Sequence, residues 1–382
     1  MKTDDPIYLD HNATTPVLPE IVDAMLPYLR QHFGNPSSSH VYGRHTQAAV
    51  TRARAQVAEL LGCNADEVIF TSGGTEANNL AIRGVTEARH ERRHVVTSVI
   101  EHPATDRPCE WLGQHGWRVS RLSVDAEGRV RVKEARATID VETALVTVMH
   151  SNNETGVLQP IAELTDLAHE CGAVVHTDAA QSVGKVPVDV RELGVDLLSV
   201  AGHKLYAPKG VGALYVRRGT PLVPFLLGAG HERGLRPGTE NVASIVGLGV
   251  ACEIAARDLQ TVAERTRRLR DDLWERLASA VPGIELNGHR TLRLPNTLNV
   301  RFPRVSGNDV LAGAPGIAAS TGSACHAGHE SASAVIQAMG VAPADALGSV
   351  RLTLGRDTSP DHVAKAAAAL VESWRRTIAA TG

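Results

Sequence analysis

The feature that most constrains the fold is a regular alternation of strand-like and helical stretches between Glu67 and about Tyr215. The strand-like runs are EVIF, HVVTSVI, TALVTVMH, GAVVHTD, VDLLSVA and GALYV, and between them apolar residues recur at helical spacing, as in 160–171. This alternation is typical of a mostly parallel sheet with helices on both faces. Ligands of such sheets bind outside the carboxyl ends of the strands. The sequence therefore predicts an α/β fold with its site at that edge.

The pattern changes after the glycine-rich segment 228–238. A long, increasingly charged helical region follows over 245–280, then the short strand candidates LPNTLNVRF and GIAASTG, and a final helix from Ser359. A chain of 382 residues is expected to form more than one domain. We predict a large domain over 15–257 and a smaller α+β domain that combines 1–14 with 258–382 and carries Cys325.

Composition excludes several classes of function. The net charge is −3, which gives no sign of a nucleic-acid or membrane surface. The start, MKTDDPIYLD, has no apolar leader, and no apolar run is long enough to span a bilayer. The five cysteines are scattered and include no C-x-x-C pair, which favours free thiols in a reducing compartment. We therefore expect a cytoplasmic protein.

Asp178 and Lys204 are the two most informative polar residues. Each follows an apolar run, in HTDAAQ and AGHK, and the interval between them has room for one helix and one more strand. An acid and a lysine at successive strand tips can meet at the carboxyl edge of the sheet. Pyridoxal phosphate needs that pair, because the lysine forms a Schiff base with it and the carboxylate keeps its pyridine nitrogen protonated.

Other polar residues are expected at the same edge. The turn TSGGTEANN (Thr71–Asn79) could bind a phosphate at a helix N-terminus, although Thr75 could equally be an ordinary cap. His102 could stack on a flat cofactor or simply bond to the backbone. Asn152 and Asn153 could reach a ring hydroxyl or a substrate carboxylate, or only build a turn. For each residue taken alone, both the functional and the structural interpretation stay open. Because five successive strand ends carry such residues, the sequence predicts that they form one site.

Cys325 lies in the small, glycine-rich segment STGSACHAGHES. An exposed thiol near cationic groups can be a thiolate nucleophile, and the alternative is a tolerated small loop residue. The neighbouring His326 and His329 do not predict zinc, because three ligands within five residues rarely close a tetrahedral site. HERRH (His90–His94) matches H-E-x-x-H, but it is highly charged and runs straight into a strand. We expect no metal site.

Taken together, these segments resemble a known family. The motifs are YLDHNATTP, FGNPSS, FTSGGTEANNLAIRG, SVIEHPA, MHSNNETG, HTDAAQSVGK, the pair HK, ERGLRPGTEN, GSAC and SVRLTLGR. They run from Tyr8 to Arg356, in the order found in the cysteine desulfurases and selenocysteine lyases. These are pyridoxal-phosphate enzymes of the class V aminotransferase fold. The resemblance implies fold type I, with a mostly parallel seven-stranded sheet in the large domain and a smaller α+β domain.

The resemblance also implies residue roles. The cofactor-binding residues would be Gly74, Thr75, His102, Asn153, Asp178, Gln181, His203, Lys204 and, from the other subunit of a homodimer, Thr239. Lys204 would bind the cofactor covalently and move the Cα proton, with His102 stacked on the ring. Arg351 would take the substrate carboxylate, assisted by Asn153. Cys325 would attack the substrate sulfur, leaving a persulfide and releasing alanine.

Two positions bear on the substrate and the cofactor. Ala201 stands where the family usually has a serine, which removes one phosphate hydroxyl and resembles the selenocysteine lyases. Pro103 after His102 resembles the cysteine desulfurases, so we predict L-cysteine as substrate, with L-selenocysteine as the alternative. The GSAC segment matches members that pass sulfur to an acceptor protein. The acceptor pathway, whether for iron–sulfur clusters, tRNA, DNA or a secondary metabolite, stays open.

Two further readings compete with a desulfurase. A transaminase-type member of the same fold would consume a keto acid and would not need Cys325. A non-catalytic sulfur-trafficking scaffold would be expected to have lost Lys204 or Asp178, and both are present.

Overall fold

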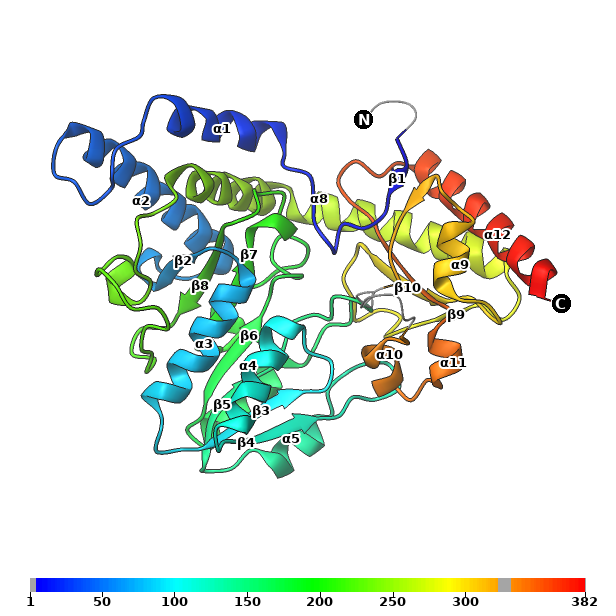
Figure 1. Ribbon diagram of the computed structural model, residues 1–382, viewed down its shortest axis with the longest axis horizontal. Coiled ribbons are helices and arrows are strands. Elements are labelled where there is room, and N and C mark those ends of the chain that lie inside the picture. Colours follow the sequence, from blue (N-terminus) through cyan, green and yellow to red (C-terminus); the bar gives the residue numbers. More distant parts are fainter. Residues whose placement is uncertain (1–4, 322–330, 382) are drawn as a thin grey trace.

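The computed structural model describes residues 5–321 and 331–381, and these residues form two lobes. A single helix, α8 (Val242–Ala280), runs from the larger lobe into the smaller one (Figure 1). None of the described helices is long and apolar enough to cross a membrane.

The larger lobe is built on a seven-stranded sheet with the strand order β2-β8-β7-β6-β5-β3-β4. The strands are β2 (Val68–Thr71), β3 (His94–Ser98), β4 (Arg118–Leu122), β5 (Thr143–Thr147), β6 (Val174–Asp178), β7 (Leu197–Ala201) and β8 (Gly212–Val216). Strand β8 runs antiparallel to both of its neighbours, and the other pairs are parallel. The predicted mostly parallel seven-stranded sheet is therefore confirmed.

Six of these strands coincide with the predicted apolar runs, because they are buried along their whole length. Such strands read as continuous apolar segments when helices cover both faces of the sheet. Strand β4 was not predicted. It is an edge strand in which Leu122 alone is buried, so its sequence RVSRL has no apolar run.

Helices cover both faces of the sheet. The helices of this lobe are α1 (Pro19–Arg30), α2 (Val41–Leu61), α3 (Gly74–Ala88), α4 (Pro103–Gln114), α5 (Val132–Thr138), α6 (Ile161–Glu170) and α7 (Val190–Leu193), with short 3-10 turns η1 (Ala65–Glu67), η2 (Gly202–Lys204) and η3 (Glu232–Gly234). Apolar residues of α3 and α4 form one core with the sheet. Residues of α2, α5, α6 and the first half of α8 form the core on the other face.

The smaller lobe has a three-stranded antiparallel sheet and a two-stranded parallel one. Its elements are β1 (Ile7–Tyr8), β9 (Glu285–Leu286), β10 (Thr297–Arg301), β11 (Ile317–Ala318), β12 (Ser349–Thr353), α9 (Gly307–Ala312), α10 (Ala334–Ala338), α11 (Pro343–Ala346) and α12 (Pro360–Thr381). Its core contains Leu9 together with residues of the second half of α8, β10, α9, β12 and α12.

The division into 15–257 and 1–14 with 258–382 stays a prediction, and the cores show that Leu9 packs with the carboxyl-terminal elements. One part of the chain behaves differently. Val335, Ile336 and Met339 of α10 and its end, with Ala346 of α11, pack into a core of the larger lobe. The boundary at 257 lies within the continuous helix α8.

Candidate active site

A cavity of about 300 Å³ lies at the carboxyl edge of the seven-stranded sheet. The predicted residues that line it are Gly74, Thr75, His102, Asn153, Asp178, Gln181, His203 and Lys204. They come from the ends of β2, β3, β5, β6 and β7, as the alternation of the sequence predicts. Thr239 and Arg351 do not line this cavity within the protomer. Cys325 lies outside the described residues.

The turn between β2 and α3 forms one end of the cavity. Gly73 has a φ of 150°, a backbone conformation that favours glycine, and α3 begins at the next residue. The first N–H groups of a helix have no intrahelical partner, so this helix start can bind an anion. A Cβ on Gly74 would lie 3.2 Å from the Cβ of Ala201 across the turn. Glycine at 74 thus keeps open a space that a side chain would narrow.

Asp178 is a buried carboxylate at the end of β6, 7% exposed. Its Oδ2 accepts a hydrogen bond from Asn78 Nδ2 at 2.6 Å, and its Oδ1 accepts one from the backbone N–H of Ala180 at 2.9 Å. These two bonds orient the carboxylate in the cavity and leave lone pairs for a further N–H donor. Asn78 projects from α3 and is not singled out by the sequence pattern, because it lies within the helix, seven residues after the end of β2.

Lys204 lies in the turn η2, directly after β7. Its Nζ donates to the backbone carbonyls of Asn12 and of Ala13, the second at 3.0 Å. Burial lowers the pKa of Lys204 to about 8, helped by the charge of Arg351 and opposed by Asp178. Near neutral pH a minor fraction of this amine, far larger than for an ordinary lysine, is therefore uncharged, as a nucleophilic or basic lysine requires.

The His102 ring lies at the cavity with one nitrogen engaged. Its Nδ1 accepts a hydrogen bond from the backbone N–H of Ala104 at 3.1 Å and so caps α4. Burial lowers the pKa of His102, opposed by Asp178 and helped by Lys204. Both readings of His102 in the sequence are therefore compatible with its position, since a capping ring can also face a cofactor.

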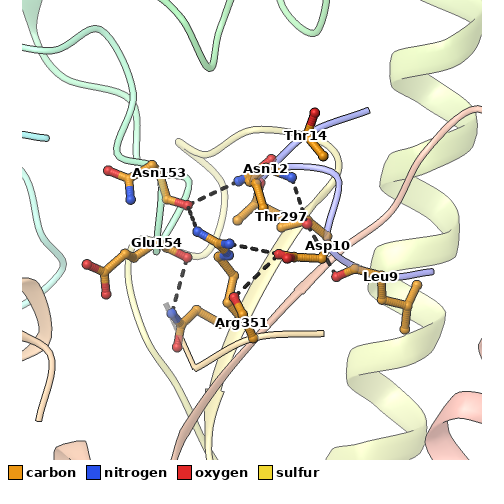
Figure 2. A network of polar contacts seen from close by, with 12 residues as sticks. Leu9, Asp10, Asn12, Thr14, Asn153, Glu154, Thr297 and Arg351 are labelled. Carbon is orange, nitrogen blue, oxygen red and sulfur yellow. Dashed lines mark hydrogen bonds and ion pairs between the residues drawn. The ribbon is translucent and has the colours of Figure 1, made fainter. Parts of the chain in front are cut away.

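The amino-terminal segment between β1 and α1 runs from the smaller lobe to the larger one (Figure 1), and Figure 2 shows the polar contacts of its residues. Asn12 is its central residue: its Nδ2 donates to Thr297 Oγ1 at 2.9 Å and to the carbonyl of Asn153 at 3.3 Å. Its carbonyl accepts from Lys204 and, at 3.0 Å, from Gln181 Nε2. The motif YLDHNATTP carried part of the family resemblance, but no role was assigned to Asn12 because it follows no strand of the large sheet.

Lys185 is a second lysine next to the site that the sequence reasoning missed. Its Nζ donates to Gln181 Oε1 at 3.0 Å and to Asn12 Oδ1 at 3.4 Å. Among the residues described, no carboxylate forms an ion pair with it. Burial, with the charges of Lys204 and Arg351, lowers the pKa of Lys185 well below 10.5. The Lys185 amine thus orients the Gln181 side chain, which in turn donates to the Asn12 carbonyl that holds Lys204.

Replacing Lys185 by methionine should change how stability depends on pH. On unfolding, the wild-type amine regains its ordinary pKa of 10.5 and therefore binds a proton more tightly than in the folded protein. Because the unfolded state then binds more protons, the free energy of unfolding of the wild type should rise with pH relative to Lys185→Met. For one proton the difference grows by up to about 1.4 kcal/mol per pH unit. Urea unfolding of both proteins between about pH 7 and pH 9 measures it.

The exposed lysine of α5, Lys133, provides the control, since Lys133→Met should leave the pH dependence unchanged. Parallel stability curves for the wild type and Lys185→Met would show that the Lys185 amine is charged in the folded protein.

Comparison with known proteins places this fold and cavity in a family. Residues 7–365 match the model of the family described as aminotransferase class-V. The chain belongs to the class-V aminotransferase family.

Within it, the chain belongs with the cysteine desulfurases. It is 46% identical over 374 residues to "Cysteine desulfurase" of Trichormus azollae, covering 97% of this chain and 94% of that protein. It is 45% identical to "Cysteine desulfurase NifS" of Azotobacter vinelandii, covering 94% and 90%. Among solved structures, a "NifS-like protein" superposes with a TM-score of 0.90 at 35% identity, covering 96% of this chain and 98% of that one. The structure "SspA in complex with cysteine" superposes with a TM-score of 0.81 at 35% identity, covering 91% and 98%.

Enzymes of this family use pyridoxal 5'-phosphate, and the residues of the cavity fit that group. A helix start with an open glycine turn suits a phosphate. A buried, oriented carboxylate such as Asp178 can accept a hydrogen bond from the pyridine N–H of the cofactor. A lysine with a lowered pKa, such as Lys204, can react with the cofactor's aldehyde. The cavity of about 300 Å³ is of the size of small-molecule sites.

Proposed function

We propose that this protein is a pyridoxal-phosphate-dependent cysteine desulfurase, which converts L-cysteine to L-alanine and transfers the sulfur to Cys325 as a persulfide. The observation that carries the proposal is the convergence of Lys204, Asp178 and His102 on one cavity, at the strand ends where the sequence predicts them. The identity of nearly half of the chain to proteins named cysteine desulfurase supports it.

The cofactor would be held by residues from four strand ends. Gly74, Thr75 and His203 would bind its phosphate, and Asp178 would accept a hydrogen bond from its ring nitrogen. Gln181 and Asn153 would bind the hydroxyl side of the ring. When bound, pyridoxal phosphate supplies a conjugated ring that accepts the electron pair released at Cα.

The chain's own residues would bind the substrate, transfer the proton and accept the sulfur. Arg351 would bind the substrate carboxylate and so orient the amino acid. Lys204, whose pKa burial lowers to about 8, would take the proton from Cα. The Cys325 thiolate would attack the substrate sulfur. The bond between Cβ and sulfur would break with its electron pair kept by Cβ. Protonation of Cβ would then give alanine, which leaves the site.

The protein would act as a homodimer in which Thr239 of one subunit reaches the phosphate bound by the other; Thr239 is exposed and lies outside the cavity of its own protomer. The persulfide would be passed to a sulfur-acceptor protein in the cytoplasm. Selenocysteine lyase is the alternative activity, with L-selenocysteine bound in the same way.

The test is product stoichiometry. The purified holoenzyme, given L-cysteine and a thiol reductant, should form alanine and sulfide in equal amounts. Mass spectrometry before reduction should find one added sulfur on Cys325. Alanine formation that requires a keto acid would point to a transaminase, and no turnover of cysteine or selenocysteine would point to a non-catalytic scaffold. Parallel assays with L-selenocysteine give the preference between the two substrates.

A further inference from the structure

The arginine predicted to bind the substrate carboxylate already holds a carboxylate of its own chain. Arg351 Nη2 forms an ion pair with Asp10 Oδ1 at 2.8 Å, and its Nη1 donates to the carbonyl of Asn153 at 3.0 Å (Figure 2). The Arg351 side chain is 7% exposed and that of Asp10 is 21% exposed. The pair is therefore largely removed from water.

The backbone holds both partners in place. Asp10 forms a parallel bridge with Thr353, two residues from Arg351 along β12. The preceding residue, Leu9, donates its N–H to the carbonyl of Ala318 at 2.8 Å and accepts from the N–H of Thr353 at 2.7 Å. The carboxylate therefore projects beside Arg351 because of strand pairing and not through a mobile surface contact.

The Arg351 guanidinium has N–H donors that the hydrogen bonds to Asn153 and Asp10 do not use. Arginine carries five N–H donors, and the described protein groups engage one bond on each Nη. The Nε is buried and has no hydrogen-bond partner among the residues described. Although donors remain, the charge is already compensated, so a second carboxylate would gain less from Arg351 than it would from an unpaired cation.

We propose that Asp10 is an internal counter-ion of the substrate-carboxylate site, and that an amino-acid substrate competes with it for Arg351. Asp10 thereby sets how strongly the site binds α-carboxylates and keeps Arg351 paired when no substrate is bound. This rests on the proposed function, because the role of Arg351 toward substrate does. Asp10 is a positioning residue in this scheme, since it acts through Arg351.

Asp10→Asn in the holoenzyme tests the competition, because the amide keeps the shape and removes the charge. Propionate, a carboxylate that lacks the amino and thiol groups of cysteine, is the probe, and uncharged propionamide is its control. Calorimetric titration should show propionate bound about tenfold more tightly by Asp10→Asn than by the wild type, with propionamide unchanged. The KM for cysteine should fall in the same direction. Asp10→Ala gives the same readout should the amide variant fold poorly.

Asp271 offers a matched control. It pairs with Arg270, which is also 7% exposed, at 2.7 Å, and Arg270 likewise donates to a backbone carbonyl, that of Leu294 at 2.9 Å. Arg270 differs from Arg351 in that it does not donate to the carbonyl of the cavity residue Asn153. Asp271→Asn makes the same change in charge and should leave propionate affinity at the wild-type value.

Propionate affinity that is unchanged or weaker in Asp10→Asn would overturn the inference, since Asp10 would then not compete for Arg351. The two proposals fail separately. A wild-type protein that forms alanine from cysteine, with no gain in propionate affinity in the variant, would refute the competition alone. Tighter propionate binding in a protein that does not turn over cysteine would refute the desulfurase activity alone.

Discussion

Replacing Lys204 by alanine should lower alanine formation from cysteine by at least about 10⁴-fold, because the variant loses both the covalent attachment of the cofactor and the base for the Cα proton. Positioned proton transfer alone contributes up to about that factor. The measurement is alanine produced by the purified variant, compared with the wild type at equal protein concentration. A small primary amine added to Lys204→Ala should restore part of the activity, since it can replace the missing base.

The control for this variant is Lys209→Ala, which removes an exposed lysine five positions further along the chain. It should keep wild-type activity. Thermal unfolding of both variants establishes that they are folded. Alanine formation by Lys204→Ala above about one per cent of the wild-type rate would mean that another residue moves the Cα proton.

Replacing Cys325 by alanine should abolish sulfide release and the sulfur adduct, because no thiolate remains to accept sulfur from cysteine. Sulfide is measured in the presence of reductant, and the adduct by mass spectrometry of the whole protein after incubation with cysteine. The absorption spectrum should still change on adding cysteine, because Cys325 is not among the predicted cofactor-binding or substrate-binding residues.

Cys63 provides the comparison for Cys325, since it is a partly buried thiol whose pKa burial raises to about 12. Such a thiol is protonated at neutral pH and should not take up sulfur. Cys63→Ala should therefore behave as the wild type. Sulfide release that survives Cys325→Ala would refute the proposed nucleophile.

The sequence was sufficient for those parts of the fold and site that depend on local pattern. The buried strands β2, β3 and β5 to β8 are visible as apolar runs, and polar residues directly after them, such as Asp178 and Lys204, could be placed at one edge. Strand β4 was missed because an edge strand has little apolar sequence. Its existence follows from parallel pairing with β3, which is a tertiary contact.

The residues around the site that escaped prediction share a different cause. Asn12 and Asp10 reach the cavity region by contacts with Lys204 and Arg351 that are remote in sequence. Lys185 looks like an ordinary charged residue after a glycine, and its lowered pKa arises from enclosure by other segments. Local pattern carries no information on such contacts, because burial of a polar side chain is decided by which distant segments pack on it.

The position of Asp10 has a consequence for biosynthesis. Its partner Arg351 is 341 positions later in the chain, and β1 pairs with a strand, β11, that is made almost as late. At typical translation rates of about 5 to 20 residues per second, about 17 to 70 s pass between the synthesis of Asp10 and that of Arg351. Closing so long a loop also costs conformational entropy. Strand β1 and Asp10 must therefore stay without these partners on the ribosome while the large sheet is made, and Arg351 acquires its counter-ion only when synthesis is nearly complete.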